Sequence, residues 1–374
     1  MANLANIYRL GVKEFWSLRR DPILLFLIFH IFTFAIYIAA TAMPDSLRKA
    51  VIAVIDEDQS ILSERIVSSF YEPHFLPAKI ITLDEMDQGM DNGKYTFVLN
   101  IPPHFSRDVL AKRSPTIQLN VDATRMSQAF TGSGYVQQIV IGEINELMKR
   151  HRSEDQLPIE LVLRARFNPG LAGSWFGAIM ELINAITMLS VILTGAALIR
   201  EKEHGTIEHL LVMPVTSEEI MLSKVWSMGL IVLLASTLSL ILVIQGWLNI
   251  PIEGSIILFM FGTFLYLFAT TSMAILIATV ARSMPQFGLL MMLILLPLQM
   301  LSGTMTPQES MPSIVQNIML IAPTTHFVSI VQAILYRGAG FEVVWKQFLI
   351  LLGIGSLFFT IAMERFRKTI SNLA

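Results

Sequence analysis

The segment from Arg200 to Lys224, REKEHGTIEHLLVMPVTSEEIMLSK, is the part of the sequence most suggestive of chemistry. Histidine is a common zinc ligand, but His204 and His209 are five residues apart. Five residues turn a helix by about 140°, whereas the two histidines of an HExxH motif lie on one face. Gly205 also weakens a helix at this point. The spacing argues against a metallopeptidase site. Two interpretations of the segment then stay open: a docking loop and an ordinary connecting loop.

Two further kinds of site fail on their spacing. The acidic run 56–58 suggests a cation loop, but an EF-hand requires Gly at its sixth position and Glu at its twelfth, where this chain has Ile61 and Val67. The sequence contains no G-x-x-x-x-G-K-[ST] motif and no kinase signature that would bind phosphate. We therefore expect no catalytic, cofactor-binding or metal-binding residues and no use of ATP by the chain itself.

Composition places these segments in a membrane protein. Hydrophobic residues make up 53% of the 374 and charged residues only 15%, against about 25% charged in soluble domains. The net charge of −2 gives no basic field for nucleic acid, and the absence of cysteine removes disulfides and thiolate sites. Six apolar runs are long enough to cross a bilayer as helices. They cover residues 23–43, 175–199, 225–247, 255–280, 285–301 and 347–363.

These spans divide the chain. We predict a polytopic α-helical membrane protein with six transmembrane helices and an α/β domain between helices 1 and 2. Residues 1–22 are expected to form an interfacial helix, 23–43 the first span, 44–174 the α/β domain and 175–374 the membrane domain. In the α/β domain, predicted strands alternate with predicted helices. The strands cover 51–55, 79–83, 95–101 and 116–121, and the helices cover 61–71, 83–92, 105–112 and 127–150. Residues 161–167 suggest a further strand on the return to the membrane.

Two features of the membrane domain differ from plain spans. Segment 304–346 is interrupted by Pro312 and Pro323, and its longest clean stretch is too short to cross a bilayer, so we expect two short re-entrant helices. Glu181 is the one acidic residue inside a predicted span. Glu181 is equally consistent with a residue that lines a transport pathway and with a residue that lies near the outer membrane interface.

Charge placement predicts the orientation. Lys and Arg gather on both chain ends and on the 200–224 loop, whereas the opposite short loops hold only Arg337 and Lys346. The positive-inside rule then places both termini and this loop in the cytoplasm and the 44–174 domain outside. The loop combines an apolar surface around Leu211 with a capping box from Thr216 to Glu219. A short amphipathic helix of this kind suits docking into a groove on a cytoplasmic partner.

Several stretches, in this order along the chain, resemble the permease subunits of ABC-2 type ABC transporters, in the bacterial exporter branch with a large periplasmic domain. They are Lys13-Glu14-Phe15, Arg20-Asp21-Pro22, Val54 to Ser60, Phe167-Asn168-Pro169, Arg200 to Glu203 with Gly205 to Glu208, Leu301-Ser302-Gly303, Met311-Pro312 and Ala322-Pro323-Thr324. His204 stands where the family often has Arg, and His209 where Gln is common. The chain is therefore identified as similar to that family over nearly its whole length.

The resemblance implies a separate ATPase subunit, which binds ATP with Mg²⁺ and docks on the 200–224 loop. The residues that it assigns to this contact are Arg200, Glu201, Lys202, Glu203, Gly205, Thr206, Glu208 and Leu211. It also implies a second permease, in a homodimer or a heterodimer, and makes a periplasmic adaptor a further candidate partner. The expected location is the bacterial inner membrane, and the expected activity is export of hydrophobic or amphipathic compounds.

Two other classes of function stay open on the residues alone. A secondary transporter would be expected to show internal repeats and paired ionisable groups in the membrane, and neither is recognisable in the sequence. A membrane-anchored sensor with a periplasmic ligand-binding domain would need a cytoplasmic output domain, and none is evident. The residues do not identify the substrate under any of these readings.

Overall fold

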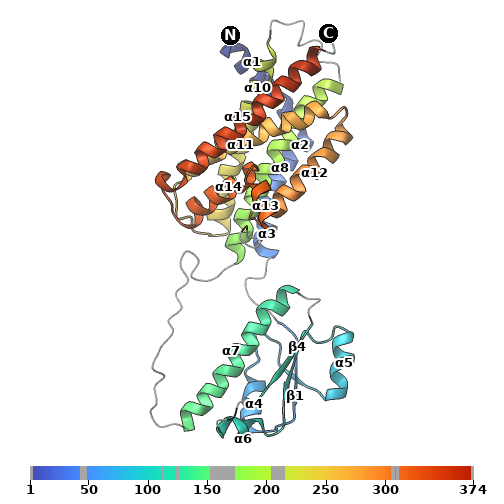
Figure 1. Cartoon of the computed structure of the whole chain (residues 1–374), viewed down its shortest axis with the longest axis vertical. Coiled ribbons are helices and arrows are strands. Elements are labelled where there is room, and N and C mark those ends of the chain that lie inside the picture. Colours follow the sequence, from blue (N-terminus) through green and yellow to red (C-terminus); the bar gives the residue numbers. More distant parts are fainter. Residues whose placement is uncertain are drawn as a thin grey trace. The chain divides into compact units, whose positions relative to one another are not determined.

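A computed structural model describes residues 3–42, 49–111, 113, 115–122, 126–151, 173–203, 215–304, 308 and 311–371. These residues form two compact units, which are described separately below. One unit contains the apolar helices of residues 3–42 and 174–371, and the other contains the segment between them (Figure 1).

Six helices of the first unit are long and apolar enough to cross a membrane. The first span, Pro22–Ala42, consists of α2 (Pro22–His30), the π-helical segment η1 (Ile31–Ala35) and α3 (Ile36–Ala42). The others are α8 (Gly173–Glu203), α10 (Ser217–Ser239) continued by the π-helical η2 (Leu240–Trp247), α11 (Ile256–Val280), α12 (Met284–Leu301) and α15 (Phe341–Ser371). Each of the six predicted spans falls on one of these helices, as expected for a polytopic membrane protein.

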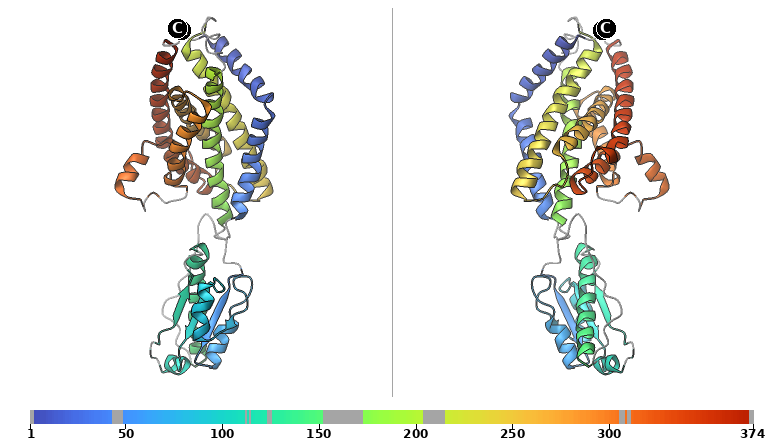
Figure 2. Two further views of the ribbon diagram at one scale, coloured as in Figure 1. Left: turned by 90° about the vertical axis from the view of Figure 1, so that its right-hand side faces the viewer. Right: turned by 90° about the vertical axis from the view of Figure 1, so that its left-hand side faces the viewer.

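Helix α8 is the most buried of the six. Its apolar stretch is 83% buried, whereas that of α12 is 11% buried. In the left view of Figure 2, α8 (green) runs between the first span (blue) and the C-terminal helices (orange and red). Buried hydroxyls join α8 to α11, because Thr187 lies 2.6 Å from the Tyr266 hydroxyl and Ser190 donates to Thr270 at 2.8 Å. Inside a bilayer such pairs satisfy polar groups that water cannot reach.

The N-terminal helix α1 (Leu4–Arg19) packs along α10. A Cβ added at Gly11 would meet the Trp226 ring at 2.1 Å, so only glycine permits this close approach. Phe15 meets the same ring edge to face at 5.5 Å. Leu4, at the start of α1, and Trp16 remain exposed. The helix thus has one face against the protein and leaves apolar groups on its surface, as an interfacial helix would.

The predicted segment 304–346 contains two short helices followed by the start of α15. They are α13 (Ser313–Met319) and α14 (Pro323–Val331), the latter continued by the π-helical η4 (Gln332–Tyr336). The pair is bent by 88°, which is the geometry of a broken span or a re-entrant loop. Pro323 begins α14, where a missing N–H costs nothing. Phe327 of α14 stacks on Tyr266 at 4.0 Å and fixes this segment against α11.

The second unit is a four-stranded sheet covered by helices. Strands β1 (Ile52–Asp56), β2 (Lys79–Ile80), β3 (Phe97–Ile101) and β4 (Gln118–Val121) lie in the order β2-β1-β3-β4. Strand β1 is parallel to β2 and β3, and β4 is antiparallel to β3. The helices are α4 (Ile61–Ser68), α5 (Leu83–Asp91), α6 (Phe105–Leu110) and α7 (Met126–His151).

Strands β1 and β3 are buried on both faces, which explains their near-continuous apolar sequences. On one face, Val54 and Leu99 share a core with residues of α4, α6 and α7. On the other face, Ala53 and Val98 pack with residues of α5. The four strands and four helices predicted for this segment are therefore present. A further strand suggested by residues 161–167 lies outside the described residues.

Candidate functional site

Four consecutive charged residues end helix α8, at the start of the 200–224 loop. Because a helix turns about 100° per residue, four successive side chains point in four directions. Each of the four contacts a different part of the membrane unit, so the end of α8 is joined to its surroundings on all sides.

Lys202 and Glu203 join α8 to the helices α11 and α12. The Lys202 ammonium donates to the carbonyls of Ala278 at 2.7 Å and Ala281 at 3.3 Å, where α11 ends and its last carbonyls lack partners within the helix. A cation here also complements the negative end of the helix dipole. Glu203 accepts a hydrogen bond from the backbone N–H of Met284, the first residue of α12, at 2.8 Å.

Arg200 joins α8 to the first span. Its guanidinium lies 3.7 Å from the Asp21 carboxylate. Asp21 is the N-cap of α2, where it also accepts from the Leu24 N–H at 3.1 Å. The Asp21-Pro22 sequence therefore does two things: it separates α1 from the first span, and it places a carboxylate beside α8.

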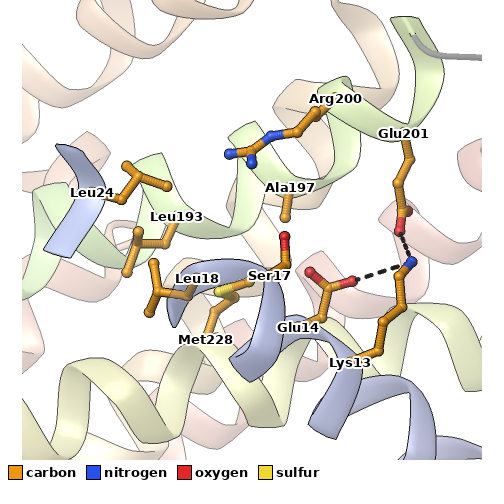
Figure 3. Close-up of a pocket in the computed structure, with 10 residues that line it drawn as sticks. All are labelled: Lys13, Glu14, Ser17, Leu18, Leu24, Leu193, Ala197, Arg200, Glu201 and Met228. Atoms are coloured by element: carbon orange, nitrogen blue, oxygen red, sulfur yellow. Dashed lines mark hydrogen bonds and ion pairs between the residues drawn. The ribbon is translucent and has the colours of Figure 1, made fainter. Parts of the chain in front are cut away.

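Glu201 belongs to a buried ion cluster that connects α8, α1 and α10. The Lys224 ammonium, with 1% of its side chain exposed, lies 2.9 Å from Glu201 and 3.1 Å from Glu14. Lys13 approaches the other oxygen of Glu201 at 3.0 Å (Figure 3). Two positive and two negative groups thus alternate in space. Such charges are tolerated away from water only because they pair with one another.

The other end of the loop is fixed as well. Thr216 and Glu219 form the predicted capping box at the start of α10. The Glu219 carboxylate also accepts from the backbone N–H of Asn3 at 2.6 Å, next to the start of α1. Glu218 pairs with Arg367 near the end of α15. Segment 204–214 is therefore bounded on both sides by residues that hold the ends of α8 and α10 to other helices.

The sequence-predicted site residues divide into three groups. Arg200 to Glu203 lie together at the end of α8, as described above. Gly205, Thr206, Glu208 and Leu211 lie outside the described residues. Glu181 is half-buried and hydrogen bonded to Asn184, one turn further along α8. It is twenty positions before Glu201 on the same helix, which separates the two by about 30 Å.

Sequence reasoning missed the central member of the ion cluster. Lys224 counted only as one of the basic residues that predict orientation, although a signal was present. A lysine directly followed by an apolar run sits at the edge of a span, where a charge needs a partner. Its partner Glu14 is 210 positions away in the chain, and no local pattern connects the two.

Comparison with known proteins covers nearly the whole chain. The family model described as ABC-2 family transporter protein matches residues 22–363. The chain is 62% identical over 374 residues to the inner membrane transport permease YhhJ of Escherichia coli, with 100% of each chain covered. It is 29% identical over 375 residues to the probable multidrug ABC transporter permease YbhR of Escherichia coli, which covers 98% of this chain and 99% of that protein.

Proposed function

We propose that this chain, which belongs to the ABC-2 family of transporter proteins, is the membrane-spanning subunit of an ATP-driven exporter. Family membership makes it a multi-pass transport permease of the inner membrane. Beyond this, the proposal adds a separate ATPase subunit that supplies hydrolysis, a second permease that completes the path, and outward transport of hydrophobic or amphipathic compounds. The name of the relative YbhR supports the class of compound, since it is called a probable multidrug permease.

The proposal has a defined topology. Both termini and the 200–224 loop face the cytoplasm, because the basic residues concentrate there. The α/β unit of residues 49–151 then lies on the periplasmic side, where it receives substrate or contacts an adaptor. Helices α13 and α14 lie in the outer leaflet, and hydrogen bonds within the segment satisfy backbone groups at their bend, where the Ala322 N–H donates to the Met319 carbonyl and the His326 ring lies 2.9 Å from the Leu320 carbonyl.

The observation that carries the proposal is the set of contacts around segment 204–214. We assign direct ATPase contact to Gly205, Thr206, Glu208 and Leu211. Arg200 to Glu203 have partners within the chain, so their part is to hold α8 in place. A movement of segment 204–214 driven by nucleotide would reach α1, α8 and α10 through the ion cluster and α11 and α12 through Lys202 and Glu203. The two arrangements of the transporter are then a conformational equilibrium biased by ATP.

The test is purification of the tagged chain from native membranes in mild detergent, with mass spectrometry of co-purifying proteins. The expected result is an ATPase with phosphate-binding motifs that co-purifies with the wild type. The double variant Glu208→Ala with Leu211→Ala should lose it, whereas Glu342→Ala, at the predicted opposite side of the membrane, should retain it. Absence of an ATPase from a preparation that preserves other membrane complexes would contradict the proposal.

A further inference from the structure

Two adjoining cavities lie beside the ion cluster, where α1 ends and the first span begins. The inner cavity, of about 250 Å³, lies among α1, α2, α8 and α10. The outer cavity, of about 530 Å³, opens between α1 and the end of α8. Both are lined by Lys13, Ser17 and Arg200, so the two cavities share part of their wall, and together they are called the α1–α8 space.

The lining of this space is apolar at one end and basic at the other. In Figure 3 four aliphatic side chains gather at one end of the inner cavity, away from the charged groups: Leu18, Leu24, Leu193 and Met228. The outer cavity instead has three cations, Lys13, Arg20 and Arg200, against the single carboxylate of Asp21. Cations therefore outnumber carboxylates in the lining of the outer cavity, whereas Glu14 and Glu201, which pair with Lys13, line only the inner cavity.

The position of the space matches the edge of a bilayer. Pro22 begins the first span and Arg200 is in the last turn of α8, so both helices reach the limit of their apolar stretches here. Trp16 lines the outer cavity, and the Arg19 guanidinium lies 5.3 Å from the centre of its ring. Tryptophan and arginine at this level are typical of the headgroup layer. The apolar end of the space then faces the hydrocarbon of the bilayer, and the basic end faces the headgroups.

From this arrangement we infer that the space binds one anionic phospholipid of the cytoplasmic leaflet. Its phosphate would lie among Lys13, Arg20 and Arg200 and accept from the Ser17 hydroxyl, and its glycerol end would extend towards Leu24 and Leu193. Basic pockets between spans on the cytoplasmic side recognise lipid headgroups in this way. Only the choice of leaflet rests on the proposed function. A lipid bound here joins α1 to α8 directly beside the ion cluster, so membrane composition would affect the stability of this joint.

The test measures thermal unfolding of the delipidated full chain in neutral detergent, without any ATPase. Dioleoyl phosphatidylglycerol should raise the unfolding temperature in a saturable manner, whereas dioleoyl phosphatidylcholine and inorganic phosphate should not. Arg20→Gln should weaken the apparent affinity for phosphatidylglycerol about fivefold, the typical contribution of one cation near an anionic surface. Arg20 is exposed, so its replacement should leave the unfolding temperature in detergent alone unchanged.

Arg9→Gln is the matched control. Arg9 is an exposed arginine of α1, whereas Arg20 is the C-cap of that helix, and Arg9 lines neither cavity, so its variant should bind phosphatidylglycerol like the wild type. Equal effects of phosphatidylglycerol and phosphatidylcholine would overturn the inference, as would equal weakening by the two variants. A full response to inorganic phosphate would show an anion site that does not require a lipid. Because the assay uses the permease alone, its result is independent of whether an ATPase co-purifies.

Discussion

The end and the middle of helix α8 are held by different kinds of interaction. At the end, Arg200 to Glu203 make ionic or charge-assisted contacts with α1, α2, α10, α11 and α12. In the middle, Thr187 and Ser190 make hydroxyl contacts with α11 alone, inside a closely packed apolar core. Charged contacts are directional, whereas apolar packing is not. The difference indicates that α8 has a fixed orientation at its end, beside segment 204–214, and is held by general burial elsewhere.

The largest expected effect is at the centre of the ion cluster. Lys224→Met should destabilise the protein by about 3–5 kcal/mol, because it leaves Glu14 and Glu201 buried without their cation. Thermal unfolding in detergent checks this. The triple variant Glu14→Gln, Glu201→Gln and Lys224→Met should recover most of the loss, since it removes both carboxylate charges as well. A single variant as stable as the wild type would show that the end of α8 does not depend on these charges.

A smaller effect is expected where α8 meets the end of α11. Lys202→Met should cost about 1.5 kcal/mol, since it removes a charged donor from the carbonyls of Ala278 and Ala281 but leaves the ion cluster intact. Lys202→Arg, which keeps the charge and the donors, is the control and should lose less. If methionine and arginine at this position have the same unfolding temperature, the contact contributes nothing beyond packing.

The middle of α8 should respond more weakly still. Tyr266→Phe removes the hydroxyl that meets Thr187 but keeps the ring that stacks on Phe327. We expect a loss of about 0.6 kcal/mol, the average for hydrogen bonds between membrane helices. Thr187 keeps its bond to the Ile183 carbonyl at 2.7 Å, so its own hydroxyl is not left unsatisfied. A loss as large as that of Lys224→Met would remove the distinction between the two parts of the helix.

The smallest effect is expected at the exposed pair that joins α10 to α15. Arg367 and Glu218 are 57% and 44% exposed, and water screens their attraction. Arg367→Gln should change stability by less than about 0.5 kcal/mol. A substantial loss, measured in the same unfolding assay, would mean that exposed charges around the loop matter as much as the buried cluster.

Sequence reasoning was most successful where a pattern is local. Runs without charge predicted six spans, and short apolar strands such as 51–55 that alternate with helices predicted the α/β unit. The candidate site was predicted only in part, because its charged residues were assigned to the ATPase contact alone and not to contacts within the chain. The ATPase contact expected of Glu201 stays a prediction, but the burial of its side chain between Lys13 and Lys224 was not expected. Contacts that bring α1 beside α10 depend on tertiary packing, including the close approach of Trp226 to Gly11, and no local pattern contains them.

The central claim is that segment 204–214 contacts a separate ATPase, and the absence of cysteine in the chain allows a direct test. A single Glu208→Cys substitution introduces the only thiol, which can be cross-linked in native membranes with a short bifunctional thiol–amine reagent. We predict an adduct of the permease with an ATPase subunit, identified by mass spectrometry, and no such adduct from Arg337→Cys. An ATPase that co-purifies with the Glu208→Cys variant but cross-links no better from this position than from Arg337→Cys would contradict the claim.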